Sequence, residues 1–163
     1  MTMLDRCVAY LKENHIRYAH SIHSPGVTAR EVAANERMPA HNLAKTVVYV
    51  GDCGYGMAIL PADCVVDFME VCRLLGLSEF RLATERELAA LFPGCEIGAM
   101  PPFGNFFNMP VLMDESLAAC EFMAFTAGTH RDALHMSVAD FHHLVNPLVA
   151  SFAVRAPTAL ASR

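Results

Sequence analysis

Three places in the sequence combine residue types that could bind or cleave a polar substrate. Lys45 is one of only two lysines in 163 residues, and it lies inside the apolar run at positions 43–50. An ammonium group is rarely buried without a partner, because its desolvation is costly. Lys45 therefore indicates either a pocket for an anion or a carbonyl, or a lysine at a strand end whose ammonium reaches water.

The second place is a long loop at residues 93–110, in which the segment 94–104 reads Gly-Cys-Glu-Ile-Gly-Ala-Met-Pro-Pro-Phe-Gly. Glycines let a backbone approach a ligand closely, and prolines stiffen a loop before binding. Loops of this length in compact domains often carry function. A structural surface loop is the alternative, and the residue pattern leaves both open.

The third place is the segment 127–132, Ala-Gly-Thr-His-Arg-Asp, which follows a predicted strand. His130 in this setting could orient a hydroxyl, relay a proton or bind a phosphate. A polar turn between two strands is the alternative. The sequence contains no nucleophile elbow, P-loop or dinucleotide fingerprint, so the nucleophile of an enzyme would be water or a hydroxyl of the substrate.

The remaining histidines and the cysteines predict no metal site. The pair His20 and His23 lies in extended chain, and the adjacent His142 and His143 point apart on a helix. The six cysteines form no CxxC pair. Metal ligands must converge, so we expect reduced thiols, structural histidines and no metal site.

Composition predicts a packed domain and excludes several classes of protein. Apolar residues make up 54% of the chain and charged residues 18%, which is typical of a globular core. No apolar stretch reaches the roughly 18 residues of a membrane span, and the first residues lack the layout of a signal peptide, so we expect a cytoplasmic protein. The net charge of -5 argues against broad coating of nucleic acid but not against contact with one end of it.

Elements that would position the three places follow from periodicity and capping signals. We predict helices over residues 3–14, 28–37, 66–75, 84–92 and 137–145. We predict strands over 16–22, 43–50, 57–60, 80–83, 111–113, 122–126 and 133–136. In the strand at 43–50, alternation puts the odd-numbered residues on one face and the even-numbered residues on the other. Because helices and strands interleave without strict alternation, a mixed-sheet α+β domain is expected over residues 1–152, followed by a frayed tail over 153–163.

Taken in order, several short motifs resemble one family. They are Thr28-x-x-Glu31, Ala44-Lys45-Thr46-Val47-Val48, Leu60-Pro61-Ala62-Asp63, Val66-Asp67, the Gly98–Gly104 segment, Asp114-Glu115-Ser116-Leu117 and Ala127-Gly128-Thr129-His130. The set resembles the free-standing aminoacyl-tRNA deacylases related to YbaK and to the editing insertion domain of prolyl-tRNA synthetase. The resemblance covers about residues 4–152.

This resemblance implies a mixed, partly barrel-like β-sheet flanked by helices, and hydrolysis of the ester between a wrong amino acid and the end of a tRNA. It implies water attack assisted by a ribose hydroxyl, without metal or cofactor. The implied catalytic residues are Lys45, Gly98 and His130. The implied substrate-binding residues are Thr46, Ala99, Met100, Pro101, Pro102, Gly128, Thr129 and Arg131. The implied partners are the aminoacyl-tRNA acceptor end and prolyl-tRNA synthetase, with the chain a monomer or homodimer.

Two departures from the family pattern leave the amino acid open. Thr46 replaces an asparagine of the alanine-removing branch, and His130 matches the insertion-domain branch, where the cysteine-removing branch has arginine. We therefore expect a small amino acid such as Ala, Cys, Ser or Thr on prolyl tRNA. A non-catalytic module that binds an aminoacyl-tRNA end, a nucleotide or a synthetase is the alternative.

Overall fold

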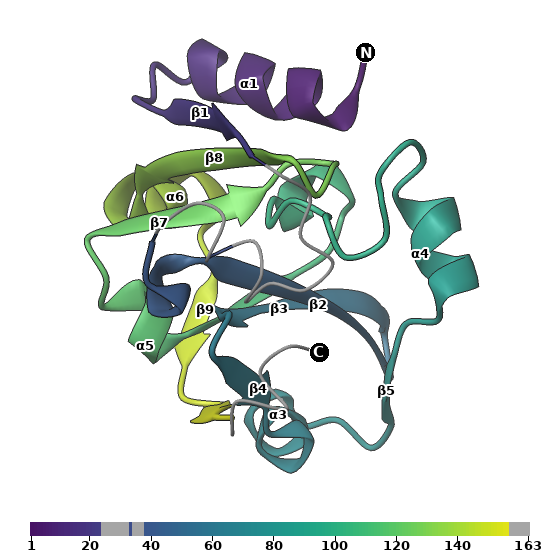
Figure 1. Cartoon of the computed structure of the whole chain (residues 1–163). Coiled ribbons are helices and arrows are strands. Elements are labelled where there is room, and N and C mark those ends of the chain that lie inside the picture. The colour runs from purple at the N-terminus through teal and green to yellow at the C-terminus, as the bar shows by residue number, and fades with distance from the viewer. Residues whose placement is uncertain (24–32, 34–37, 157–163) are drawn as a thin grey trace.

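The computed structural model describes residues 1–23, 33 and 38–156, which form five α-helices and ten strands (Figure 1). The helices are α1 (Met3–Glu13), α3 (Phe68–Leu75), α4 (Glu85–Leu91), α5 (Glu115–Ala118) and α6 (Val138–Val145). The strands are β1 (Ala19–Ile22), β2 (Ala44–Gly51), β3 (Gly54–Pro61), β4 (Cys64–Val66), β5 (Phe80–Leu82), β6 (Val111–Asp114), β7 (Phe122–Thr126), β8 (Asp132–Ser137), β9 (Leu148–Ala150) and β10 (Ala153–Arg155).

A mixed five-stranded sheet lies at the centre of the molecule, in the order β5-β2-β3-β6-β9. Strands β2 and β3 form an antiparallel hairpin, whereas β6 runs parallel to both β3 and β9. A second sheet, β1-β8-β7, is antiparallel, and β10 pairs with β4. The expected α+β class with a mixed sheet is confirmed.

The two larger sheets meet at one place. A parallel bridge between Leu43 and Ala124 joins the start of β2 to β7. This bridge gives the described strands a partly wrapped arrangement without closing them into a barrel. Because the bridge is parallel, β7 and β2 run in the same direction from it.

The central sheet separates two hydrophobic cores, because successive side chains of a strand point to opposite faces. Ala44 and Val48 of β2 join the larger core, together with α1, β7, β8 and the loop at residues 93–110. Tyr49 joins the smaller core, which α3 and Phe152 cover from the other side. The alternation predicted for this strand is therefore confirmed.

Capping residues explain where the helices begin. Thr84 and Glu87 form the expected capping box of α4, and Ser137 accepts a hydrogen bond from the Asp140 N–H at the start of α6. Asp67 caps α3, so this helix begins at Phe68, two residues later than predicted. The residues just before it form β4 instead.

Two strands near the C-terminus were not predicted. Residues 148–150 pair with β6, and residues 153–155, expected to be frayed, pair with β4. Each covers only three residues, too short for a periodic signal. The helix expected over 28–37, its capping residues and the chain beyond 156 lie outside the described residues, apart from Ala33, which is buried.

All six cysteines are free, as expected. Among the described residues, no helix has the length and apolar character needed to cross a membrane.

Candidate active site

The segment at residues 94–104, called here the Gly98 loop, turns from the surface into the larger core at a single glycine. Gly98 is exposed and has a φ of 90°, a value that side-chain-bearing residues rarely adopt. The next four residues, Ala99, Met100, Pro101 and Pro102, are buried. The two prolines and the buried Met100 side chain therefore hold the loop in one conformation, with Gly98 at its outer edge.

The backbone amides of this loop are only partly used. The Gly98 N–H donates to the Met100 Sδ atom at 3.2 Å, and the Ala99 N–H donates to the Glu96 carbonyl at 3.0 Å. Within the described part of the chain, the N–H groups of Ile97 and Met100 make no hydrogen bond. A thioether is a weak acceptor, so an oxygen ligand could replace it at Gly98.

A second loop, residues 127–131, is tied to the first by two backbone hydrogen bonds. The Gly128 N–H donates to the Ala99 carbonyl and the Glu96 N–H donates to the Gly128 carbonyl, both at 2.8 Å. Gly128 has a φ of 94°, and a Cβ atom there would lie 2.8 Å from Met3 Cβ. Only glycine fits this position, which fixes the two loops side by side against α1.

His130 lies directly over Gly98. Its Nε2 atom is 2.8 Å from the Ile97 carbonyl oxygen, and its backbone N–H donates to Glu96 Oε1 at 3.3 Å. A carbonyl oxygen can only accept a hydrogen bond, so Nε2 carries the proton and Nδ1 of the neutral ring keeps its lone pair. A Cβ atom on Gly98 would lie 3.2 Å from His130 Cε1. The structure therefore brings Gly98 and His130 into contact.

Asp132 holds the rest of the second loop. It accepts the Thr129 hydroxyl at 2.6 Å through Oδ2 and lies 2.7 Å from His20 Nε2 through Oδ1. The Thr129 hydroxyl oxygen in turn accepts the N–H groups of Arg131 and Asp132. Burial raises the pKa of Asp132, but the hydrogen bonds from Thr129 and His20 outweigh it and leave the pKa lowered. Arg131 is exposed.

Lys45 lies in β2, as the apolar run predicted. Its ammonium donates to the Cys64 carbonyl at 2.5 Å, its one hydrogen bond within the part of the chain that the structure describes. Burial lowers the pKa of Lys45, and the nearby Cys64 and Asp63 partly offset this effect. The ammonium therefore lies against a backbone acceptor and is partly withdrawn from water, with two N–H donors left over.

Lys45 and Thr46 occupy opposite faces of the central sheet. Lys45 pairs with Leu60, a residue of the smaller core, whereas Thr46 pairs with Ile59, which packs in the larger core with Met100. Paired residues of adjacent strands share a face. Thr46 is therefore on the face that the Gly98 loop covers, and the hydrogen bond of Lys45 is made on the other face.

The two joined loops, residues 96–100 and 128–132, form the loop pair. Two residues of the loop pair were not singled out from the sequence. Glu96 bonds His130 through its side chain and Gly128 through its backbone, and Asp132 bonds Thr129 and His20. The Thr129-x-x-Asp132 spacing resembles the capping pattern used for the helices, and it could have indicated the turn. No comparable local signal marks Glu96.

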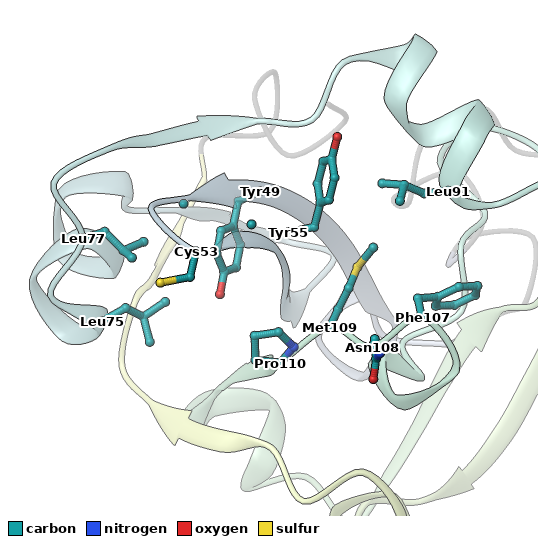
Figure 2. Close-up of a pocket in the computed structure, with 12 residues that line it drawn as sticks. Tyr49, Cys53, Tyr55, Leu75, Leu77, Leu91, Phe107, Asn108, Met109 and Pro110 are labelled. Atoms are coloured by element: carbon teal, nitrogen blue, oxygen red, sulfur yellow. The ribbon is translucent and has the colours of Figure 1, made fainter.

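A cavity lies elsewhere, at the turn of the β2–β3 hairpin (Figure 2). It has a volume of about 390 Å³, and its walls include Tyr49, Tyr55, Leu77, Phe107 and Met109. None of the predicted site residues lines it, and none of the described residues that line it is charged. Its uncharged lining suits an apolar ligand better than a charged one, and its volume suits a small ligand.

Residues 23–144 match the aminoacyl-tRNA editing domain family, and the chain belongs to this family.

Curated relatives share part of their sequence with this chain. The chain is 29% identical over 108 residues to the proline–tRNA ligase of Leuconostoc citreum (strain KM20), 66% of this chain and 18% of the ligase. It is 25% identical over 130 residues to the ligase of Methylobacillus flagellatus, 76% of this chain and 22% of the ligase. The chain thus spans about a fifth of the length of these relatives.

Two solved structures share the fold over nearly their whole length. One is described as a candidate trans-editing enzyme for prolyl tRNA synthetase, with 24% identity, a TM-score of 0.78 and coverage of 93% of this chain and 97% of that chain. The other is described only as a hypothetical protein, with 21% identity, a TM-score of 0.81 and coverage of 91% and 99%.

Proposed function

We propose that the chain deacylates mischarged aminoacyl-tRNA in trans, and that its substrate is prolyl tRNA carrying Ala, Cys, Ser or Thr. Membership of the editing-domain family supports the class of reaction. The observation that carries the proposal is the pair of hydrogen-bonded loops, in which Gly98 lies against His130. Water adds to the ester carbonyl, the bond to the ribose oxygen breaks, and the products are the free amino acid and the uncharged tRNA end.

The Gly98 loop supplies the donors for this reaction. Negative charge builds on the carbonyl oxygen when water attacks, and a fixed backbone donor stabilises it by roughly 3 kcal/mol. Met100 N–H makes no hydrogen bond to the described residues, and Gly98 N–H has only a thioether acceptor. These two amides are the proposed donors, and the buried prolines keep them in place.

His130 and Lys45 are proposed to act on the substrate from two sides. His130 Nδ1, which keeps its lone pair, accepts a hydrogen bond from the amino group or a ribose hydroxyl of the substrate. Lys45, with two unused N–H donors, anchors a terminal phosphate of the tRNA. Thr46 and the buried side chains of Ala99 and Met100 limit the size of the amino acid, each methylene being worth about 1–3 kcal/mol.

The test is single-turnover deacylation of Ala-, Cys-, Ser-, Thr- and Pro-tRNA by the wild type and by Lys45→Ala and His130→Ala. Lys12→Ala is the matched control, because Lys12 is the other lysine and lies exposed in the last turn of α1. We expect cleavage of at least one mischarged tRNA, a loss of about 100-fold in Lys45→Ala, and little change in Lys12→Ala. Absence of cleavage from every tRNA, or equal rates in both lysine variants, contradicts the proposal.

A non-catalytic tRNA-binding module is the second candidate, and one observation favours it. The Lys45 ammonium is bonded to Cys64 on the opposite face of the sheet from the Gly98 loop. Saturable binding of aminoacyl-tRNA, without turnover and with weaker binding by Lys45→Ala, would identify this function.

A further inference from the structure

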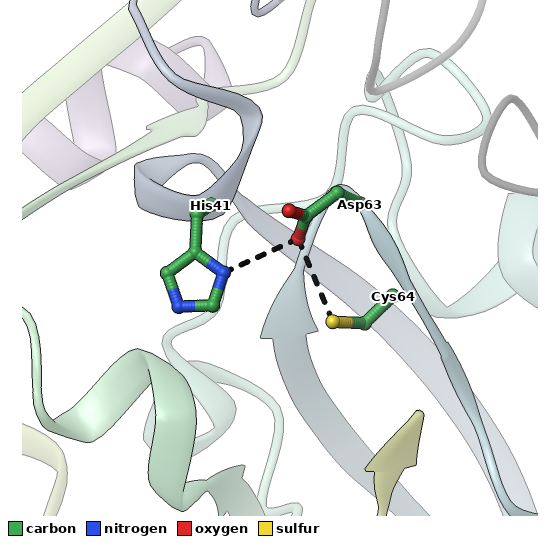
Figure 3. A group of neighbouring side chains, drawn as sticks. All are labelled: His41, Asp63 and Cys64. Carbon is green, nitrogen blue, oxygen red and sulfur yellow. Dashed lines mark hydrogen bonds and ion pairs between the residues drawn. The ribbon is translucent and has the colours of Figure 1, made fainter. Parts of the chain in front are cut away.

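Three side chains of different chemistry converge beside the start of β4 (Figure 3). His41 Nδ1 lies 3.4 Å from Asp63 Oδ1, and Cys64 Sγ lies 3.5 Å from the same oxygen. The three ligand atoms all lie within 4.8 Å of one another. Asp63 and Cys64 are buried, and His41 is partly exposed, so the cluster is open to solvent on the histidine side.

The backbone holds these residues together independently of their side chains. His41 belongs to the short 3-10 helix Ala40–Asn42, which is attached through the Ala62 N–H donating to the Ala40 carbonyl at 3.1 Å. On the other side, the Ala156 N–H donates to the Asp63 carbonyl, and β10 pairs with β4. The ligand-bearing segments are therefore fixed in place, which lowers the ordering cost of binding an ion.

An imidazole, a thiolate and a carboxylate are the ligand types that zinc accepts. With the usual Zn–N, Zn–O and Zn–S bond lengths, a tetrahedral site has N–O and S–O edges of about 3.4 and 3.5 Å. The separations of His41 and Cys64 from Asp63 match these edges. We propose that His41, Asp63 and Cys64 form a zinc-binding site with three protein ligands and an open fourth position.

Neighbouring charges set the conditions for binding. Arg155 donates to Asp63 Oδ2 at 3.0 Å, which leaves Oδ1 for the ion and orients the carboxylate, while the Arg155 side chain is 80% exposed. Burial, followed by the charges of Asp63 and Asp114, raises the pKa of Cys64 to about 11, and Lys45 lowers it in part. Binding therefore displaces the thiol proton to solvent, and the ion must compete with that proton.

The alternative is a cluster whose hydrogen bonds serve only the fold, with the Cys64 thiol donating to Asp63. The sequence shows no ligand spacing for this site, because 21 residues separate His41 from Asp63. The proposal is independent of the editing reaction, and its test does not use that reaction.

The test uses Co²⁺ as a probe on the full reduced chain, followed by displacement with Zn²⁺. We expect thiolate-to-cobalt charge-transfer absorption saturating at one equivalent, and a higher melting temperature with Zn²⁺. Cys64→Ser should abolish the band, and His41→Ala should weaken Zn²⁺ binding by about 100-fold or more. Cys53→Ser is the matched control, because Cys53 is the exposed free thiol and should leave the band unchanged.

Two results would overturn the proposal. One is the absence of a charge-transfer band in the wild type at micromolar cobalt and protein. The other is a band that survives in Cys64→Ser and disappears in Cys53→Ser, which would assign it to a surface thiol. Melting curves of Cys64→Ser and His41→Ala in the presence of a chelator show whether each variant is folded. If Cys64→Ser does not fold, His41→Ala still tests the proposal, because His41 is partly exposed and its substitution removes no buried side chain.

Discussion

The loop pair and the hairpin cavity are two regions that could receive an organic ligand, and they differ in kind. The loop pair, residues 96–100 and 128–132, offers backbone donors, an imidazole and a carboxylate network. The hairpin cavity offers about 390 Å³ of largely apolar space, and none of the described residues that line it is charged. Under the proposed function the chemistry lies outside the hairpin cavity, because hydrolysis of an ester needs oriented donors more than enclosed volume.

Among substitutions in these two regions, adding one methyl group at Gly98 should have the largest effect on stability and deacylation. The variant Gly98→Ala combines a strained φ of 90° with a Cβ atom 3.2 Å from His130 Cε1. We expect a stability loss of about 1–2 kcal/mol and a loss of deacylation of about tenfold or more. Thermal unfolding and single-turnover assays measure the two effects.

Gly94→Ala is the matched control for this variant. Gly94 has a φ of 77°, but its Cβ would meet nothing within 4 Å. We expect the same strain, about 1–2 kcal/mol, with no specific loss of activity. Equal losses of activity in both variants would show that strain, and not contact with His130, explains the effect.

Removing the charge of Asp132 should have an intermediate effect that depends on pH. Hydrogen bonds from Thr129 and His20 leave the folded-state pKa of Asp132 below its unfolded value near 3.9. The ionised carboxylate therefore stabilises the fold above about pH 4, and this contribution is lost as the pH falls through the folded-state pKa. At pH 7, Asp132→Asn should cost about 1 kcal/mol, because the group is partly exposed.

Urea unfolding of the wild type and of Asp132→Asn at several pH values measures this difference. The gap between the two proteins should shrink as the pH falls below about 4. If the difference in free energy of unfolding stays constant from neutral to acid pH, the negative charge of Asp132 does not stabilise the Thr129–Asp132 turn.

Filling the hairpin cavity should have the smallest effect on function. Cys53 is exposed at the rim of the cavity, so Cys53→Phe can place a ring in the open space without removing a buried contact. Deacylation should stay within about twofold of the wild type, because the cavity supplies no donor to the ester. A large loss of activity would indicate that the active site lies at the hairpin cavity and not at the loop pair.

Much of the fold followed from the sequence because its longer elements carry their own signals. The alternation of β2 predicted which of its residues face each core, and the capping box at Thr84 marked the start of α4. The strands at 64–66, 148–150 and 153–155 did not follow from it. They exist because β4 and β10 pair with each other and β9 pairs with β6, and pairing partners are not visible in three residues.

The candidate site was predictable in part for the same reason. Unusual glycines and polar residues in loops indicated Gly98 and His130, and the structure places them in contact. The partners that orient them, Glu96 and Asp132, depend on which loops meet in three dimensions. The hydrogen bond between Lys45 and the Cys64 carbonyl is equally non-local, since it joins β2 to β4.

Strand β3 is shared by the two cores, and this has a consequence for how the molecule opens. Met57 and Ile59 belong to the larger core, Ala58 and Leu60 to the smaller one, and β2 and β6 flank the strand. Neither core can lose β3 without exposing the other, so the two should unfold as one cooperative unit. Amide hydrogens of β3 should accordingly exchange with solvent only through global unfolding, later than those of the edge strands β5 and β9.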